Sequence, residues 1–161
     1  MHRRKLLSLM KLAVVVQLLL LDACSGNITI SVDKQLPPTF TFSRNFAELD
    51  YLPMFYVSEV DPENVKIPYT KERKDNKMIW QITPKTAENG EIDQLPPIVY
   101  GIVPSGFKQL VPELGSPPQL VEGIIYEAGG PAVQMPKGFL RFTIRDDQIV
   151  RVPIIQPYGD N

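Results

Sequence analysis

Residues 139–155 read FLRFTIRDDQIVRVPII, and this stretch decides the fold class more clearly than any other. Leu140, Phe142 and Ile144 alternate with polar side chains, which is the period of two expected of a strand with one buried face. Asp146-Asp147 then separates residues 139–145 from a second apolar segment, residues 148–155. The pattern predicts a terminal β-hairpin with the two aspartates at its turn.

Similar short segments recur along the rest of the chain. Ile28, Ile30 and Val32 alternate with polar residues, and so do Phe40 and Phe42. Residues 98–103 are apolar on both faces, as expected of a central strand. Residues 120–126 contain a glycine that suits a bulge. Further candidate strands lie at residues 52–60, 78–83 and 107–111.

Proline is frequent and scattered. All 16 prolines follow Cys24, and this spacing disfavours long helices but suits short strands joined by turns. Eight or nine short strands in one unit of this length predict an all-β domain, an immunoglobulin-like or fibronectin type III-like β-sandwich. A small closed β-barrel is the alternative. The expected core residues are Phe40, Phe42, Trp80, Ile98, Ile102, Leu140 and Phe142.

The N-terminal residues have the composition of an export signal. Arg3, Arg4 and Lys5 precede an apolar run over residues 12–21, and the small residue Ala23 precedes the chain's one cysteine. The run is shorter than the roughly 20 residues that cross a bilayer. We therefore expect residues 1–23 to be removed as a signal peptide.

Leu21-Asp22-Ala23-Cys24 resembles the lipobox of bacterial lipoproteins. The resemblance covers the first 24 residues, and Asp22 departs from the small or hydroxylated residues usual at its position. It implies that Cys24 receives a diacylglyceryl group and then a fatty acyl chain such as palmitate. Ser25 implies sorting to the outer membrane, by similarity to enterobacterial lipoproteins. The alternative is an ordinary secretory signal cut near Ala23, which would leave a soluble secreted or periplasmic protein.

This organisation predicts a signal peptide at residues 1–23, a lipidated short tether at 24–27, one β-sandwich domain at 28–157 and a tail at 158–161. The 138 residues from Cys24 onward carry 13 basic and 17 acidic side chains, a formal charge of −4. Nucleic-acid binding requires a clustered basic surface, so we expect no nucleic-acid partner. Membrane attachment would come from the lipid on Cys24.

The residues available for chemistry are few. The one histidine, His2, lies in the signal, and the one cysteine is assigned to lipid. The domain therefore lacks the side chains for Ser-His-Asp or Cys-His catalysis and for zinc sites built on His or Cys. We predict no catalytic, cofactor or metal residues, and a non-catalytic binding or accessory role toward another envelope protein. The alternative is a hydrolase of glycans or other substrates that uses carboxylates such as Glu113, Glu122 and Glu127.

The predicted partner-binding site is the loop between Pro104 and Pro112. Proline restricts the backbone, so less conformational entropy is lost on binding. Phe107 is expected to be an apolar anchor, with Lys108 and Gln109 on the rim. The competing interpretation is a tight turn whose Phe107 points into the core.

Four other features have a structural interpretation that we prefer. Trp80 is expected to be a core residue rather than a platform for a ligand. The aromatic residues of the stretch 50–57 are expected to pack in the core and at its rim, with a partner patch as the alternative. The charged run 71–77 is interpreted as a solvated connection, and Asp146-Asp147 as a turn rather than a cation site.

Overall fold

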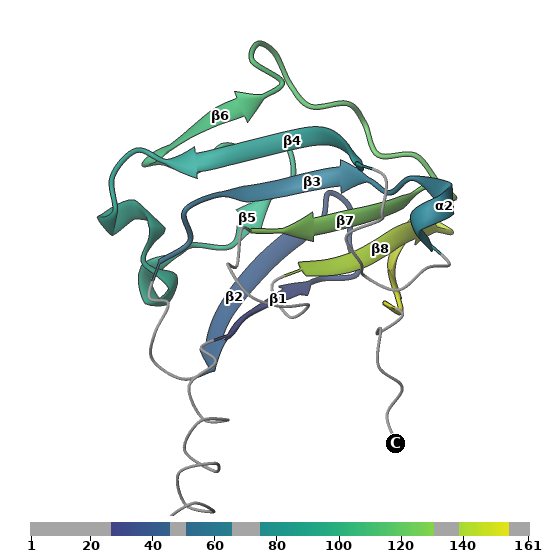
Figure 1. Cartoon of the computed structure of the whole chain (residues 1–161), viewed down its shortest axis with the longest axis horizontal. Coiled ribbons are helices and arrows are strands. Elements are labelled where there is room, and N and C mark those ends of the chain that lie inside the picture. The colour runs from purple at the N-terminus through teal and green to yellow at the C-terminus, as the bar shows by residue number, and fades with distance from the viewer. Residues whose placement is uncertain (1–26, 46–50, 66–74, 131–138, 155–161) are drawn as a thin grey trace, which may run out of the picture.

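The computed structural model describes residues 27–45, 51–65, 75–130 and 139–154. These residues form nine strands in two antiparallel sheets of three and six strands, which confirms the predicted all-β sandwich. The alternative of a closed barrel is wrong, because the described strands divide into two separate sheets (Figure 1).

The smaller sheet has the order β1-β2-β5. It consists of β1 (Asn27–Val32), β2 (Thr39–Asn45) and the two-residue β5 (Ile98–Val99). β1 and β2 form a hairpin in which Ile30 lies opposite Phe42. Ile28, Ile30 and Phe40 are buried, so the alternating residues of both strands face the core as the sequence predicts.

The larger sheet has the order β6-β4-β3-β7-β8-β9. Consecutive neighbours are antiparallel, and shifts in register interrupt the β3–β4 and β4–β6 pairings. The strands are β3 (Phe55–Glu59), β4 (Lys77–Pro84), β6 (Phe107–Val111), β7 (Ile125–Gly129), β8 (Phe139–Arg145) and β9 (Gln148–Val152).

Helical structure is limited to three short turns in the described residues. They are α2 (Pro62–Val65) and the 3₁₀ turns η2 (Glu88–Gly90) and η3 (Ile92–Gln94). None of the helices in this part of the chain is long and apolar enough to cross a membrane.

The terminal hairpin forms as predicted. Arg145 pairs with Gln148, so Asp146 and Asp147 make a two-residue turn between β8 and β9. Their φ angles are 50° and 56°. Positive φ at both central positions is the geometry of a type I′ turn, which matches the twist of the flanking strands and which aspartate tolerates.

A chain of aromatic rings joins the two sheets. Phe40 of β2 lies 5.0 Å from Phe55 of β3 and 5.9 Å from Phe142 of β8, measured between ring centroids. The rings of Trp80 and Phe55 are 6.0 Å apart between centroids, in an edge-to-face arrangement. The Trp80 side chain is fully buried, as expected. Aromatic contacts of this kind stabilise a core beyond the area they bury. Ile98, Leu140 and Phe142 are also buried, and Phe42 is partly buried.

Two sequence predictions about apolar segments are wrong. Ile102 was expected in the core but is 60% exposed. Residues 98–103 do not form a central strand, because the chain turns at Gly101, whose φ is 82°, and Ile102 donates its amide to the Val99 carbonyl. Gly123, with a φ of 79°, likewise lies in a turn rather than at a bulge within a strand.

The larger sheet also carries a buried ion pair on the face away from the aromatic core. Arg141 of β8 donates from Nε to Oε2 of Glu127 on β7 at 3.2 Å, and the two side chains are 1% and 4% exposed. Arg141 also donates to the Asn64 carbonyl of α2, and Asn76 donates to the second oxygen of Glu127. The pair therefore connects α2 and the start of β4 to the sheet.

Breaking this pair is expected to be costly. Arg141→Met leaves Glu127 buried without its cation and should lower the free energy of unfolding by about 3–5 kcal/mol. The double variant Arg141→Met/Glu127→Leu should recover part of this loss, because it buries no unpaired charge. Urea denaturation measures both. The exposed cross-strand pair Lys77–Glu59, at 3.1 Å, is the matched control, and Lys77→Met should cost less than about 1 kcal/mol. Equal losses for the two single variants would contradict this account.

Candidate functional site

The predicted partner-binding residues lie on the edge strand β6, which matches the candidate strand predicted at residues 107–111 and lies within the expected loop 104–112. Phe107 begins β6 and is only 3% exposed within the core cluster. The prediction that Phe107 is an exposed anchor is therefore wrong, and the competing interpretation, a core residue, holds. Its amide donates to Pro104, which closes the tight turn before the strand. Lys108 is exposed and Gln109 is half-buried.

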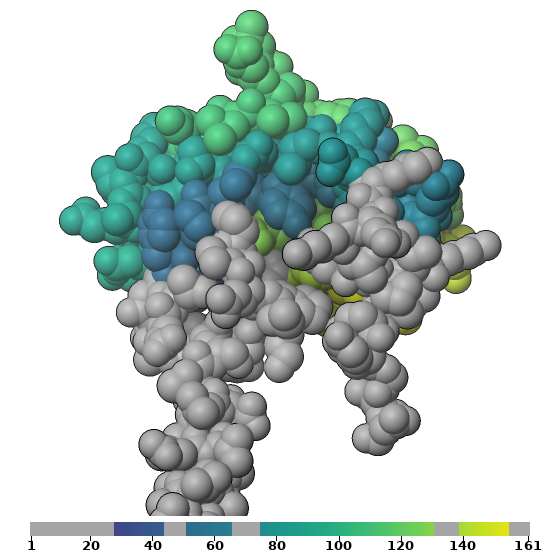
Figure 2. Space-filling model, viewed as in Figure 1, coloured from purple at the N-terminus to yellow at the C-terminus, as the bar shows by residue number. Residues whose placement is uncertain are grey.

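Gln109 has a positioning role that the sequence did not indicate. Its Oε1 accepts a hydrogen bond from the Trp80 indole at 3.1 Å. Its Nε2 donates to the carbonyls of Pro112 and Gly115 at 2.7 and 2.8 Å. The side chain thus connects the core to the start of the connection between β6 and β7, the segment that protrudes in green at the top of Figure 2.

Two tyrosines at the ends of the aromatic chain hold the later part of that connection. Tyr100 packs against Trp80 at 5.3 Å and donates its hydroxyl to the Pro118 carbonyl at 2.8 Å. Tyr126 stacks on Phe142 at 5.5 Å, and its hydroxyl accepts the Val121 amide at 2.8 Å. Residues 118–121 are therefore fixed from inside the sandwich.

A groove of about 460 Å³ opens beside these residues. We call it the proline groove, because four prolines line it together with the ring of Tyr100. The Tyr100 amide donates to the Pro38 carbonyl at 2.9 Å, which fixes the turn before β2 as one wall. Gly101 lies beside Pro117 of the opposite segment, and its φ of 82° is a conformation that favours glycine. The lining residues are Leu36, Pro37, Pro38, Tyr100, Gly101, Ser116, Pro117, Pro118, Gln119 and Leu120.

Exposed apolar side chains are frequent in the segments that line the proline groove and in the residues next to them. Five of the eight large apolar side chains that are exposed in the described residues line it or lie within two residues of its lining segments. Leu114 is 88% exposed and Ile102 is 60% exposed. Single exposed apolar residues are ordinary, whereas several in neighbouring segments make a surface worth testing for binding. The other three residues of this set are Leu36, Val103 and Val121.

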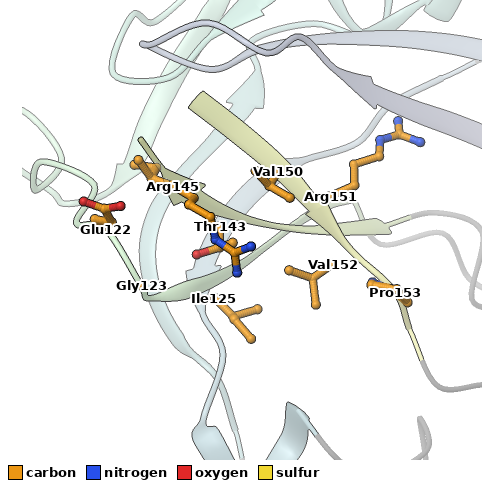
Figure 3. A pocket seen from close by; sticks show the side chains of 10 residues that line it. Glu122, Gly123, Ile125, Thr143, Arg145, Val150, Arg151, Val152 and Pro153 are labelled. Atoms are coloured by element: carbon orange, nitrogen blue, oxygen red, sulfur yellow. The ribbon is translucent and has the colours of Figure 1, made fainter. Parts of the chain in front are cut away.

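A second hollow of about 500 Å³ lies on the outer face of β7, β8 and β9 (Figure 3). We call it the β-face trough. Its surface is made by Ile125, Thr143, Val150 and Val152, which neighbouring strands bring together. The carboxylate of Glu122 lies at one end.

Two of the three carboxylates considered for catalysis are held by the protein itself, and the third, Glu113, is exposed. Glu127 is buried in its ion pair with Arg141. Glu122 accepts the Asp146 amide at 3.0 Å, which supports the hairpin turn. The described residues contain no cluster of three or more His, Cys, Asp or Glu side chains arranged to hold a metal ion.

The remaining sequence candidates divide between core and surface. Phe55 is fully buried, while Tyr51 and Tyr56 are half-buried, which matches core and rim packing. Residues 71–74 of the charged run lie outside the described residues, as does Cys24.

The chain matches no protein-family model, no curated protein and no solved structure.

We expect truncation of Phe107 to lower the free energy of unfolding much more than truncation of Lys108. Phe107→Ala removes a buried ring and should lower the free energy of unfolding by about 3–5 kcal/mol. Lys108→Ala removes an exposed side chain and should change it by less than about 0.5 kcal/mol. Urea denaturation of both variants provides the test, and a loss below 1 kcal/mol for Phe107→Ala would show that the ring is not part of the core.

We expect the protein to lose stability at alkaline pH because Tyr100 and Tyr126 are buried. Burial raises the pKa of Tyr100, and the negative charges of Tyr126 and Glu59 raise it further. Burial also raises the pKa of Tyr126, although its hydrogen bond with Val121 opposes the rise. Because the unfolded pKa is about 10, the stabilisation is complete below that pH and is lost as the pH rises above it.

The measurement is the free energy of unfolding between pH 8 and pH 11.5. Tyr100→Phe should flatten the decline above pH 10, because phenylalanine does not ionise. An identical decline in the wild type and in Tyr100→Phe would contradict the assignment.

Proposed function

We propose that the protein is a lipid-anchored, non-catalytic accessory protein of the bacterial cell envelope that binds another envelope protein through the proline groove. The observation that supports this best is the combination of a fixed groove with the exposed apolar side chains around it. Binding there would bury apolar surface without first ordering the loop, because Tyr100 and Tyr126 already hold it.

The anchor is supported by the resemblance of residues 21–24 to a lipobox. Diacylglyceryl attachment and a further acyl chain at Cys24 supply two or more chains, which hold a protein stably at a membrane where one does not. We propose the outer membrane on the basis of Ser25. With signal cleavage before Cys24, the domain would face the periplasm or the cell exterior.

The position of β1 relative to Cys24 suggests how the groove would be presented. β1 begins at Asn27, three residues after Cys24, so its first residue would lie within about 10 Å of the lipid. The strand then runs for roughly 17 Å to Val32. Leu36, Pro37 and Pro38 follow that far end and line the groove. Part of the proline groove would thus lie beyond the end of β1 that is farther from the anchor.

The chemistry of the groove indicates the kind of segment that it binds. Its lining contains no charged residue, and prolines donate no backbone hydrogen bonds. An apolar or aromatic side chain from a partner suits such walls, with its own N–H or O–H groups directed at the carbonyls. The carboxylates Glu122 and Glu127 already have partners within the chain, and this favours binding over a carboxylate-dependent hydrolase.

The anchor is tested by metabolic labelling. Cells that express the wild type should incorporate radioactive palmitate into the protein, and Cys24→Ala should abolish the label and release the protein from the membrane fraction. Label retained by Cys24→Ala would overturn the lipoprotein assignment.

The binding site is tested by crosslinking in intact cells. A photo-crosslinking amino acid at Val121, which is 55% exposed beside the groove, should give one dominant partner band identified by mass spectrometry. Lys108 is the matched control, because it is exposed on β6 and does not line the groove. Pro117→Asp should remove the Val121 product. Equal products from the two positions would contradict the groove as the site.

A further inference from the structure

The β-face trough combines an apolar surface with an exposed guanidinium group. Ile125 pairs with Thr143, and Thr143 pairs with Val150, so the three side chains form one row across the outer face of β7, β8 and β9. Val152 extends the surface, and Val150 is 37% exposed. A row of this kind favours contact with an apolar chain.

Arg145 provides the charge. Its side chain is exposed, and the structure gives its guanidinium no ion pair or hydrogen bond with a described residue. Figure 3 shows the group directed over the trough, above Thr143. Glu122 is the one carboxylate among the lining residues, and one of its oxygens already accepts the Asp146 amide. The positive charge of Arg145 is therefore available to an incoming anion.

The edge of the sheet argues for a small molecule rather than an added strand. The Ile149 amide donates to the Lys34 carbonyl at 3.0 Å, so the turn after β1 already occupies part of the β9 edge. Arg151 donates to the Ile30 carbonyl, and Figure 3 shows its guanidinium directed away from the trough. A partner strand would have to displace these contacts, whereas a ligand lying on the face would not.

We infer that the β-face trough binds a carboxylate carried on an apolar chain, a molecule of the medium-chain fatty-acid class. The carboxylate accepts hydrogen bonds from the Arg145 guanidinium, whose planar donors suit it. The chain lies along Ile125, Val150 and Val152. The hollow of about 500 Å³ is within the size range of small-molecule sites. This inference does not rest on the proposed function of the proline groove.

The experiment uses three probes on the full chain carrying Cys24→Ala, so that no attached lipid competes. Sodium decanoate supplies both the chain and the carboxylate, decanol the chain alone, and sodium acetate the carboxylate alone. Methyl NMR of labelled isoleucine and valine follows Ile125, Val150 and Val152 during each titration. Decanoate should bind with a dissociation constant of about 1 mM. Decanol should bind about three to ten times more weakly, and acetate should not saturate the site below about 10 mM.

Three variants separate the contributions. Arg145→Gln should weaken decanoate three- to tenfold and remove its advantage over decanol. Val150→Asp should abolish decanoate binding, and an unchanged melting temperature will show that the fold is intact. Lys108→Gln removes an exposed charge on the opposite edge strand and should change nothing.

Three outcomes would overturn the inference. Equal affinities of decanoate and decanol in the wild type would show that Arg145 does not bind the carboxylate. Decanoate shifts spread over methyl groups outside the trough would show non-specific binding. The third outcome is that the wild type does not bind decanoate and that Val150→Asp changes the sedimentation coefficient. This result would show that the face is an interface between copies of the chain.

Discussion

The chain of aromatic contacts from Tyr100 through Trp80, Phe55, Phe40 and Phe142 to Tyr126 is the interaction on which the rest of the structure depends. It joins the three-stranded and six-stranded sheets through their buried faces. In a domain without disulfides, such contacts supply much of the apolar area that stabilises the fold. Its two ends carry hydroxyl groups, and both reach the connection between β6 and β7. The packing of the core therefore sets the position of the segment that forms the proline groove.

This coupling explains why a long connection can have a defined shape. Gln109 accepts a hydrogen bond from the Trp80 indole and donates one to the Pro112 carbonyl, near the start of the connection. The two tyrosines hold residues 118–121 through their hydroxyl groups. Pro117 and Pro118, which also line the groove, restrict the backbone of the connection further. An apolar surface that is already ordered loses little entropy on binding, so it can bind a partner with a modest contact area. The proposed binding role depends on the apolar side chains exposed there.

The sequence predicted the strands well because alternation reports directly on burial. The hairpin around Asp146-Asp147, the pairs Ile28/Ile30 and Phe40/Phe42, and the buried Trp80 all follow from local pattern. Ile102 was misplaced because an apolar run on both faces reads as a central strand, while Gly101 turns the chain outward. Phe107 was misplaced because a single sequence, which predicts a strand at residues 107–111 as well as a loop between Pro104 and Pro112, does not show that the first ring of that strand points into the core. The proline groove was not predicted, since it unites residues 36–38, 100–101 and 116–120, and single-sequence patterns do not report such long-range contacts.

The core fixes the groove through the tyrosine hydroxyls. Amide hydrogen exchange of Tyr126→Phe tests it most directly, with Tyr51→Phe as the matched control. Loss of the hydroxyl should accelerate exchange of the Val121 amide about fivefold relative to the amides of Phe142 and Ile144 in β8, which report opening of the sheet. Tyr51→Phe should leave that ratio unchanged. An unchanged ratio in Tyr126→Phe would show that the segment keeps its structure without the core hydroxyl, and would contradict the account.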